Sequence, residues 1–292
     1  MCAAALVMAA APAAQDAAPV VLIFDAAGES TPETLVAAVS RADVAFIGED
    51  YGDRETHRVE RWLFDTVSKV RGDVTLALEM FGRDVQEPLE HFQMGHLGDA
   101  ELVAEARPWA DYVTTYKPLL DLAVSGKWPI VAANAPRAVV DAAAASGADV
   151  LKSLAAGDGP LFARDVACPT SGEQFERFRR LTGTPATPSV TPAPDARSLD
   201  RAYFAECLKE ETMAESIANA YAVAAIGGKS PLVISLNGRF HIEYGQGVVE
   251  RTRRRMPGRT LVTMAIVPVP TLQSLPTSGG PRRADFTVFV AR

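Results

Sequence analysis

A glutamate and a tyrosine stand close together where a short apolar segment ends near the amino terminus. The segment Val44–Ile47 is followed by Gly48, Glu49, Asp50 and Tyr51. A short apolar run bounded by charge is typical of a buried strand, and ligands in open α/β sheets lie beyond the carboxyl ends of such strands. Carboxylates and phenols hydrogen-bond and exchange protons. We therefore expect Glu49 and Tyr51 to face a ligand site.

The same combination of an apolar segment and a polar end recurs three times along the chain. The polar ends are Glu79 with Arg83, Asn134 with Arg137, and Asn237 with His241. Carboxyl ends of neighbouring parallel strands meet at one edge of a sheet, so we expect these side chains to converge on one crevice. Because a buried carboxylate without a partner is costly, the alternative for Glu79 is a structural ion pair with Arg83 or Arg137.

Histidine is scarce, with four residues, so each can be weighed separately. His241 is the strongest candidate for chemistry, because it precedes the glycine-rich segment Tyr244–Gly247, and glycine lets the backbone approach a ligand closely. The alternative is a structural histidine in a turn. His57 is expected either to line the cleft or to face water, and His91 and His96 are expected to be solvated.

The charged residues argue against nucleic acid as a partner. The 292-residue chain has a net charge of -7, whereas binding to a phosphate backbone needs clustered Lys and Arg. We expect the one basic cluster to form a solvated helix face or, if that helix borders the crevice, to bind carboxylates of a ligand. The cluster consists of Arg251, Arg253, Arg254, Arg255 and Arg259.

Signatures of several common enzyme classes are absent from the sequence. There is no H-E-x-x-H or C-x-x-C motif, no G-x-x-x-x-G-K-[ST] phosphate loop and no G-x-S-x-G nucleophile elbow. The usual indications of a zinc protease, a P-loop hydrolase and a serine hydrolase are therefore missing.

Seven apolar segments alternate with helical patterns along most of the chain. They are Val20–Phe24, Val44–Ile47, Val74–Leu78, Pro129–Ala132, Leu232–Leu236, Leu261–Val267 and Phe286–Val290. Such alternation predicts an α/β fold with a largely parallel central sheet flanked by helices. The last segment is expected to form a sheet edge. A helix is predicted to begin near Asp53.

The connection between the fourth and fifth segments is about 100 residues long, far beyond an ordinary crossover, so we expect a helical insertion over residues 150–225. It should contain a helix at Gly172–Leu181, a proline-rich loop, and a long helix from Ser198, its N-cap, to Ala224. Cys168 and Cys207 flank the loop, and they form either a disulfide bridge or two free buried thiols.

The first 18 residues resemble a signal peptide, because Met1–Ala14 are almost wholly apolar and small and include the cleavage-like Ala11–Ala13. We expect residues 19–292 to form one domain that is secreted to the periplasm or envelope. Membrane anchoring through Cys2 is an alternative.

Six segments in a common order carry a family resemblance. They are Ile47–Glu49, Leu78–Phe81 with Arg83–Gln86, Trp109 with Tyr116–Leu120, Asn134–Arg137, Glu211–Ser216, and Asn237–His241 with Tyr244–Gly247. Together they resemble the ChaN-like haem-binding family, within a superfamily that includes Tiki-type metalloproteases and erythromycin esterases. The resemblance departs at Tyr51, where the superfamily pattern G-E-x-H has histidine.

The resemblance implies a non-enzymatic protein that binds haem in the crevice and serves haem or iron acquisition. The implied axial ligands are, in order, Tyr51, Tyr116 and Tyr244, because phenolate binds ferric haem. The iron would be held by Tyr51 and His241. His57 is the alternative to His241 as a second ligand or as a hydrogen-bond partner. The expected lining of the haem site comprises Glu49, Glu79, Arg83, Asn134, Arg137 and Asn237.

The implied partners are haem, outer-membrane haem-uptake machinery and a second copy of the chain in a face-to-face homodimer. The alternative function is a hydrolase of the esterase or metalloprotease type. It would use a divalent transition metal with Glu49, Glu79 and His241 as acid, base or ligand.

Overall fold

The structure is a computed structural model that describes residues 18–153, 161–163, 165–183, 196–275 and 280–292. The signal-like segment, apart from its last residue, lies outside the described residues, and so does the proline-rich loop.

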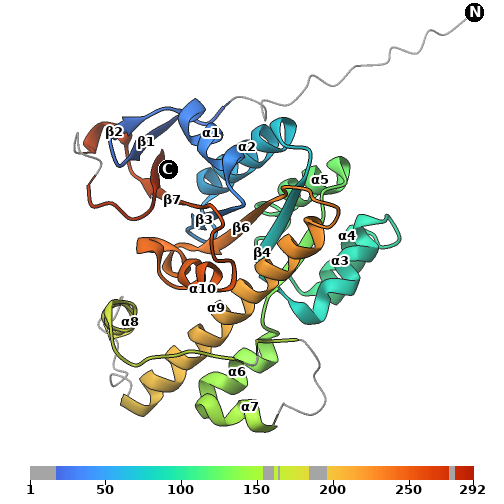
Figure 1. The fold of residues 1–292 in the computed structure, drawn as a ribbon, viewed down its shortest axis with the longest axis vertical. Coiled ribbons are helices and arrows are strands. Elements are labelled where there is room, and N and C mark those ends of the chain that lie inside the picture. Colours follow the sequence, from blue (N-terminus) through green and yellow to red (C-terminus); the bar gives the residue numbers. More distant parts are fainter. Residues whose placement is uncertain (1–17, 154–160, 164, 184–195, 276–279) are drawn as a thin grey trace, which may run out of the picture.

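An eight-stranded sheet forms the centre of the fold, in the order β2-β1-β8-β7-β3-β6-β4-β5 (Figure 1). Its strands are β1 (Val21–Asp25), β2 (Gly28–Ser30), β3 (Val44–Glu49), β4 (Val74–Gly82), β5 (Ile130–Asn134), β6 (Leu232–Gly238), β7 (Leu261–Val269) and β8 (Phe286–Ala291). The strands from β8 to β5 run parallel, and β1 and β2 are antiparallel additions. The largely parallel sheet and all seven predicted strands are therefore confirmed.

One expectation about the sheet is wrong. The segment Phe286–Val290 forms β8, which lies between β1 and β7 and so is not an edge. The short β2, which the sequence pattern did not predict, occupies that edge instead. The three residues of β2 include a glycine and a charged residue and show no alternation of apolar and polar side chains. The sequence pattern therefore does not predict this strand.

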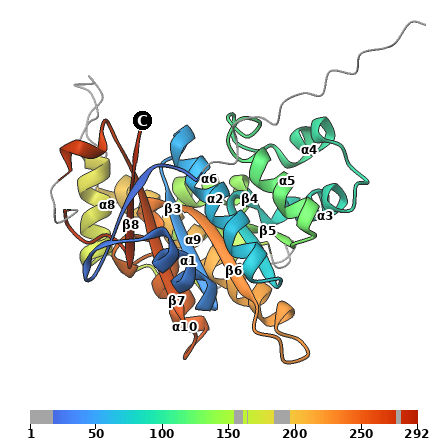
Figure 2. The same cartoon turned by 90° about the horizontal axis from the view of Figure 1, so that it is seen from above.

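Helices cover both faces of the sheet (Figure 2). Alternate strand residues pack into two apolar clusters, one with α1 to α5 and the other with α9 and α10. The helices are α1 (Pro32–Arg41), α2 (Arg54–Val70), α3 (Gln86–Gln93), α4 (Asp99–Ala106), α5 (Lys117–Gly126), α6 (Arg137–Ser146), α7 (Val150–Ser153), α8 (Glu173–Gly183), α9 (Ala196–Ala224) and α10 (Val248–Arg255). None of the helices in the described part of the chain is long and apolar enough to span a membrane.

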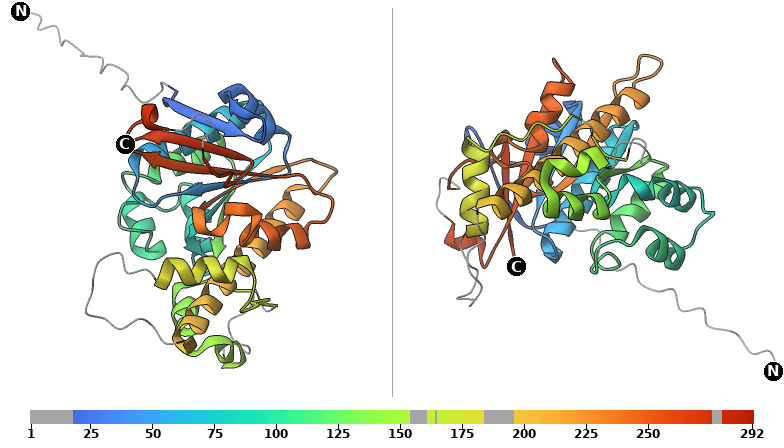
Figure 3. Two further views of the ribbon diagram at one scale, coloured as in Figure 1. Left: turned by 90° about the vertical axis from the view of Figure 1, so that its left-hand side faces the viewer. Right: turned by 90° about the horizontal axis from the view of Figure 1, so that it is seen from below.

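The expected helical insertion between β5 and β6 contains α7, α8 and α9. The amino-terminal half of α9 packs against α6 and α8 beside the sheet, and its other half runs along the sheet (Figures 1 and 3). This helix begins at Ala196, so Ser198 lies in its first turn and is not the N-cap that was predicted. A disulfide joins Cys168 to Cys207 on α9, which settles the alternative between bridge and free thiols.

The helix predicted to begin near Asp53 is α2, and Asp53 is its N-cap. The Asp53 carboxylate accepts a hydrogen bond from the Thr56 backbone N–H at 2.9 Å. We expect Asp53→Ala to lower the free energy of unfolding by about 1 kcal/mol in urea denaturation. Asp53→Asn retains the cap and loses only the exposed ion pair with Arg292. It should therefore stay within about 0.5 kcal/mol of wild type. Equal losses in both variants would contradict this role of the cap.

Candidate functional site

The ends of four adjacent strands, β3, β6, β4 and β5, open into a crevice. Its main cavity has a volume of about 800 Å³, within the range of clefts that hold small ligands. Four of the predicted residues line it: Tyr51, Glu79, Asn134 and Arg137. A second cavity of about 510 Å³ includes Glu49 and His241 and shares Tyr51 with the first. The strand ends converge as expected from the sequence, although Arg83 and Asn237 line neither cavity, and Tyr51 borders both.

Tyr51 is the accessible phenol of the crevice. Its side chain is 52% exposed, and its ring meets Trp109 edge-on with centroids 4.5 Å apart. Its hydroxyl lies against Gly238. Any other residue at position 238 would place its Cβ atom within 2.3 Å of the phenol oxygen and would displace the ring. Burial of the hydroxyl and the charges of Glu79 and Glu49 raise the pKa of Tyr51 above its ordinary value. The free phenol is therefore neutral.

Glu79 forms the centre of a buried charge network on the crevice floor. Its Oε1 lies 3.2 Å from His241 Nε2 and 3.4 Å from Lys209 Nζ, and its Oε2 accepts from the Gly238 N–H at 2.8 Å. Burial alone would raise the pKa of Glu79, but His241 and Lys209 lower it overall. The structural alternative of a pair with Arg83 or Arg137 is not what the structure shows, since Glu79 pairs with crevice residues.

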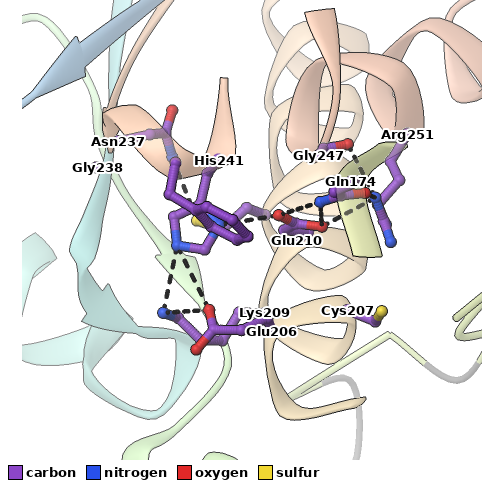
Figure 4. A network of polar contacts seen from close by, with 12 residues as sticks. Gln174, Glu206, Cys207, Lys209, Glu210, Asn237, Gly238, His241, Gly247 and Arg251 are labelled. Atoms are coloured by element: carbon purple, nitrogen blue, oxygen red, sulfur yellow. Dashed lines mark hydrogen bonds and ion pairs between the residues drawn. The ribbon is translucent and has the colours of Figure 1, made fainter. Parts of the chain in front are cut away.

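His241 is held as a charged imidazolium. Its Nδ1 lies 3.0 Å from Glu210 Oε1, and its Nε2 lies near Glu206 (Figure 4). The same Nε2 also lies near Glu79. Burial would lower the pKa of His241, but Glu79 and Glu210 raise it to about 9. A protonated imidazole has no lone pair for a metal or a proton. This state does not suit His241 as an iron ligand or as the base of the alternative hydrolase.

Two of the predicted tyrosine ligands do not reach the crevice. Tyr116 is 1% exposed and donates to Glu49 Oε1 at 2.7 Å, so it supports the crevice wall. Tyr244 is half-exposed but borders a separate cavity with Arg253, Arg282 and Arg283. The sequence could not distinguish these tyrosines from Tyr51, because the burial and the orientation of each side chain depend on how distant segments pack.

Arg83 and Asn237 also lie outside the crevice. Arg83 turns to α9, where its Nη1 pairs with Glu215 Oε1 at 2.9 Å. Asn237 is buried between Ser235 and Met213, with Ser235 donating to its side-chain oxygen at 2.8 Å. Both residues therefore hold α9 to the sheet.

The basic cluster on α10 is not a fully solvated face. Arg251 is 3% exposed and pairs with Glu210 at 2.9 Å, as Figure 4 shows. Arg254 and Arg255 both pair with Glu211. These arginines neutralise carboxylates of α9, so they do not provide ligand contacts in the crevice.

His57 neither lines the cavities nor faces water. It is buried beneath the crevice with Glu49 and Glu60, and its Nδ1 lies 2.8 Å from Glu60 Oε2 and 3.5 Å from Glu49 Oε2. Burial raises the pKa of Glu60 to about 8, and burial with the charge of Glu60 raises the pKa of Glu49. Burial lowers the pKa of His57. Glu60 was missed from the sequence, although its place three residues after His57 puts both on one helix face.

Other lining residues were also missed from the sequence. They include Met80, Arg107, Glu206 and Lys209. Glu206 and Lys209 lie three residues apart on α9 with an Nζ to Oε2 distance of 3.1 Å. The sequence did contain an indication of these two residues, because their charges interrupt the apolar stripe of a long helix that is predicted to be buried.

The fold is similar to solved structures of low sequence identity. A ChaN of Campylobacter jejuni, described for its cofacial haem binding, has a TM-score of 0.64 and 15% identity over 92% of this chain and 96% of that chain. A Bacillus cereus protein has a TM-score of 0.48 and 10% identity over 89% and 90% of the two chains. A variant of the erythromycin esterase EreC has a TM-score of 0.45 and 14% identity over 86% and 78%. Only the first similarity is strong enough to support the fold.

Comparison with curated protein sequences gives no match. Residues 35–252 do match a protein family, and that range includes every lining residue discussed above except Arg253, Arg282 and Arg283 of the separate cavity. The family is described as "Haem-binding uptake, Tiki superfamily, ChaN". The matched range covers most of the chain, and the resemblance expected from the six sequence segments is confirmed. The chain therefore belongs to the ChaN family of haem-binding uptake proteins in the Tiki superfamily.

Proposed function

We propose that this protein binds haem in the crevice, as a member of a haem-binding uptake family. The observation that supports this most directly is Tyr51, a half-exposed phenol set against Trp109 at the border of a ligand-sized cavity. Phenolate is a ligand of ferric haem, and aromatic side chains suit a flat macrocycle. Haem would supply a ferric centre, and Tyr51 would hold it through its phenol oxygen after losing its proton to solvent.

The lip of the crevice carries cations for the two haem carboxylates. Arg137 is exposed at the start of α6, and Arg107 is largely exposed at the end of α4, where it pairs with Asp84 at 3.2 Å. Both line the main cavity. Guanidinium groups bind carboxylates in bidentate fashion, so Arg107 and Arg137 would hold the propionates while Tyr51 holds the iron.

The test is a titration of the purified apoprotein with hemin, followed by the Soret band. We expect saturable binding, and we expect Tyr51→Phe to change the spectrum and weaken affinity by about tenfold or more, because the variant lacks the ligand oxygen. Tyr244→Phe is the matched control, since Tyr244 is a half-exposed tyrosine outside the crevice, and it should behave like wild type. Identical spectra for the two variants, or weak nonsaturable uptake by wild type, would refute the proposal.

We also propose an envelope location, delivery to or from outer-membrane haem-uptake machinery, and a haem-linked homodimer. The disulfide between Cys168 and Cys207 supports an oxidising compartment, and the open crevice supports a flat ligand shared by two copies. Cell fractionation tests the location.

Sedimentation with and without hemin tests the dimer, which should form only with hemin and should be lost in Tyr51→Phe.

A further inference from the structure

Beneath the crevice, Glu49, His57 and Glu60 form a compact buried cluster of metal-ligand type. One potential ligand atom from each lies within 4.8 Å of the others. All three side chains are nearly inaccessible, with exposures of 2%, 6% and 1%. The cluster joins the end of β3 to the first turns of α2, on either side of the turn that presents Tyr51.

Three polar atoms of this cluster lack hydrogen-bond partners within the described residues. They are Glu49 Oε2, His57 Nε2 and Glu60 Oε1. Tyr116 already saturates the other oxygen of Glu49, and no Lys or Arg of the described chain pairs with either carboxylate. Two ionised carboxylates that are buried without a cation are costly. A bound cation would therefore stabilise the cluster.

The separation of two of the donors fits a bound ion. Ligand atoms at about 2.1 Å from a tetrahedral ion are about 3.4 Å apart, and His57 Nδ1 lies 3.5 Å from Glu49 Oε2. His57 Nδ1 lies 2.8 Å from Glu60 Oε2, so an ion would replace the proton between these two atoms and move them apart. One imidazole nitrogen with two carboxylate oxygens is a donor set for divalent transition ions, whereas calcium and magnesium prefer oxygen alone and copper(I) prefers sulfur.

Aromatic side chains separate His57 and Glu60 from the main cavity of the crevice, whereas Glu49 borders the second cavity. The His57 ring meets Tyr116 at 4.5 Å, Tyr116 meets Trp109 at 5.4 Å, and Trp109 meets Tyr51 at 4.5 Å, all edge-on. Because these rings cover His57 and Glu60, and Glu49 is only 2% exposed, an ion there would be closed to a substrate. It would fix the turn between β3 and α2 and take no part in hydrolysis.

We propose that Glu49, His57 and Glu60 bind one divalent transition-metal ion as a structural site beneath the haem crevice. The proposal is independent of haem, because none of the three residues lines the main cavity and the test uses no haem.

The test is titration of chelator-treated apoprotein with Co²⁺, read by its visible d–d bands, and with Zn²⁺, read by calorimetry and by the thermal midpoint. We expect one ion per chain and a higher thermal midpoint. Glu60→Gln and His57→Gln should each weaken binding by more than about tenfold. Glu60→Gln keeps size and shape, and circular dichroism checks that both variants fold.

Two control variants locate the ion. His91→Gln removes an exposed histidine and should bind metal like wild type. His241→Gln should also retain the ion. Loss of binding in His241→Gln with retention in Glu60→Gln would overturn the proposal and place the ion in the crevice. No binding of either metal by wild type at micromolar concentrations would overturn it too, and would leave the cluster as two carboxyl groups sharing protons with an imidazole.

Discussion

Replacement of Glu79 by Gln is expected to lower the free energy of unfolding by about 3 to 5 kcal/mol, the cost of removing one partner from a buried ion pair. Glutamine keeps the volume and an oxygen for the Gly238 N–H. It removes the more deeply buried of the two carboxylates that contact both His241 and Lys209, whose Nε2 and Nζ atoms are 3.4 Å apart. The variant would leave the buried His241 and the partly buried Lys209 side by side with the partly exposed Glu206 as their shared carboxylate. Urea denaturation at neutral pH measures the difference.

Glu206→Gln is the matched control. Glu206 contacts the same two cations, at 3.1 Å from Lys209 and 3.6 Å from His241, but its side chain is 27% exposed. Water screens a charge in that position, so we expect a loss of no more than about 1 kcal/mol. Similar losses in the two variants would show that burial of Glu79 does not set the strength of the network.

Stability is expected to fall as pH rises from about 6.5 to 9. The folded-state pKa of His241 is raised to about 9 from an ordinary value of 6.5, so the folded chain holds a proton that the unfolded chain releases. This contribution is complete below pH 6.5 and is lost as pH passes 9. At 1.36 kcal/mol per pKa unit it amounts to about 3 kcal/mol. Urea denaturation across this range measures the loss.

The imidazole resonance of His241 in nuclear magnetic resonance spectra gives the direct check. Its titration midpoint should lie near 9 in wild type and should fall in Glu79→Gln, where the carboxylate that holds the proton is gone. A wild-type midpoint at or below 6.5 would contradict both the charged state of His241 and the origin of the pH dependence. Loss of stability at high pH without any shift of this resonance would assign the effect to other groups.

Much of the fold was predictable because local patterns decide it. Val44–Ile47 is a continuous apolar run, and Leu232–Leu236 is apolar except for Ser235. Short runs of this kind are typical of strands buried on both faces of a sheet. Asp53 starts α2 through a bond to a residue three positions away. The edge was misjudged because the pairing of β8 with β1 joins segments from opposite ends of the chain, and no local pattern encodes it.

The candidate site was predictable only in part, for a related reason. Four of the site residues lie at or just beyond the carboxyl ends of parallel strands, and these ends bring them together. They are Glu49, Tyr51, Glu79 and Asn134. Tyr116 and Tyr244 look equally suitable in the sequence, yet one is buried against Glu49 and the other faces a separate arginine-lined cavity. Lys209 was missed because its partner Glu79 is far away along the chain.

By itself the sequence determined the class of fold, the family and the strand ends that carry the polar residues, because these depend on hydrophobic period and on short segments. Only the tertiary structure decided which phenol is accessible, that His241 is charged, and that Glu49 turns toward His57 and Glu60 beneath the crevice. Burial and the sign of neighbouring charges set these properties. Both depend on contacts between residues such as Glu79 and His241, which are distant in sequence and adjacent only after folding.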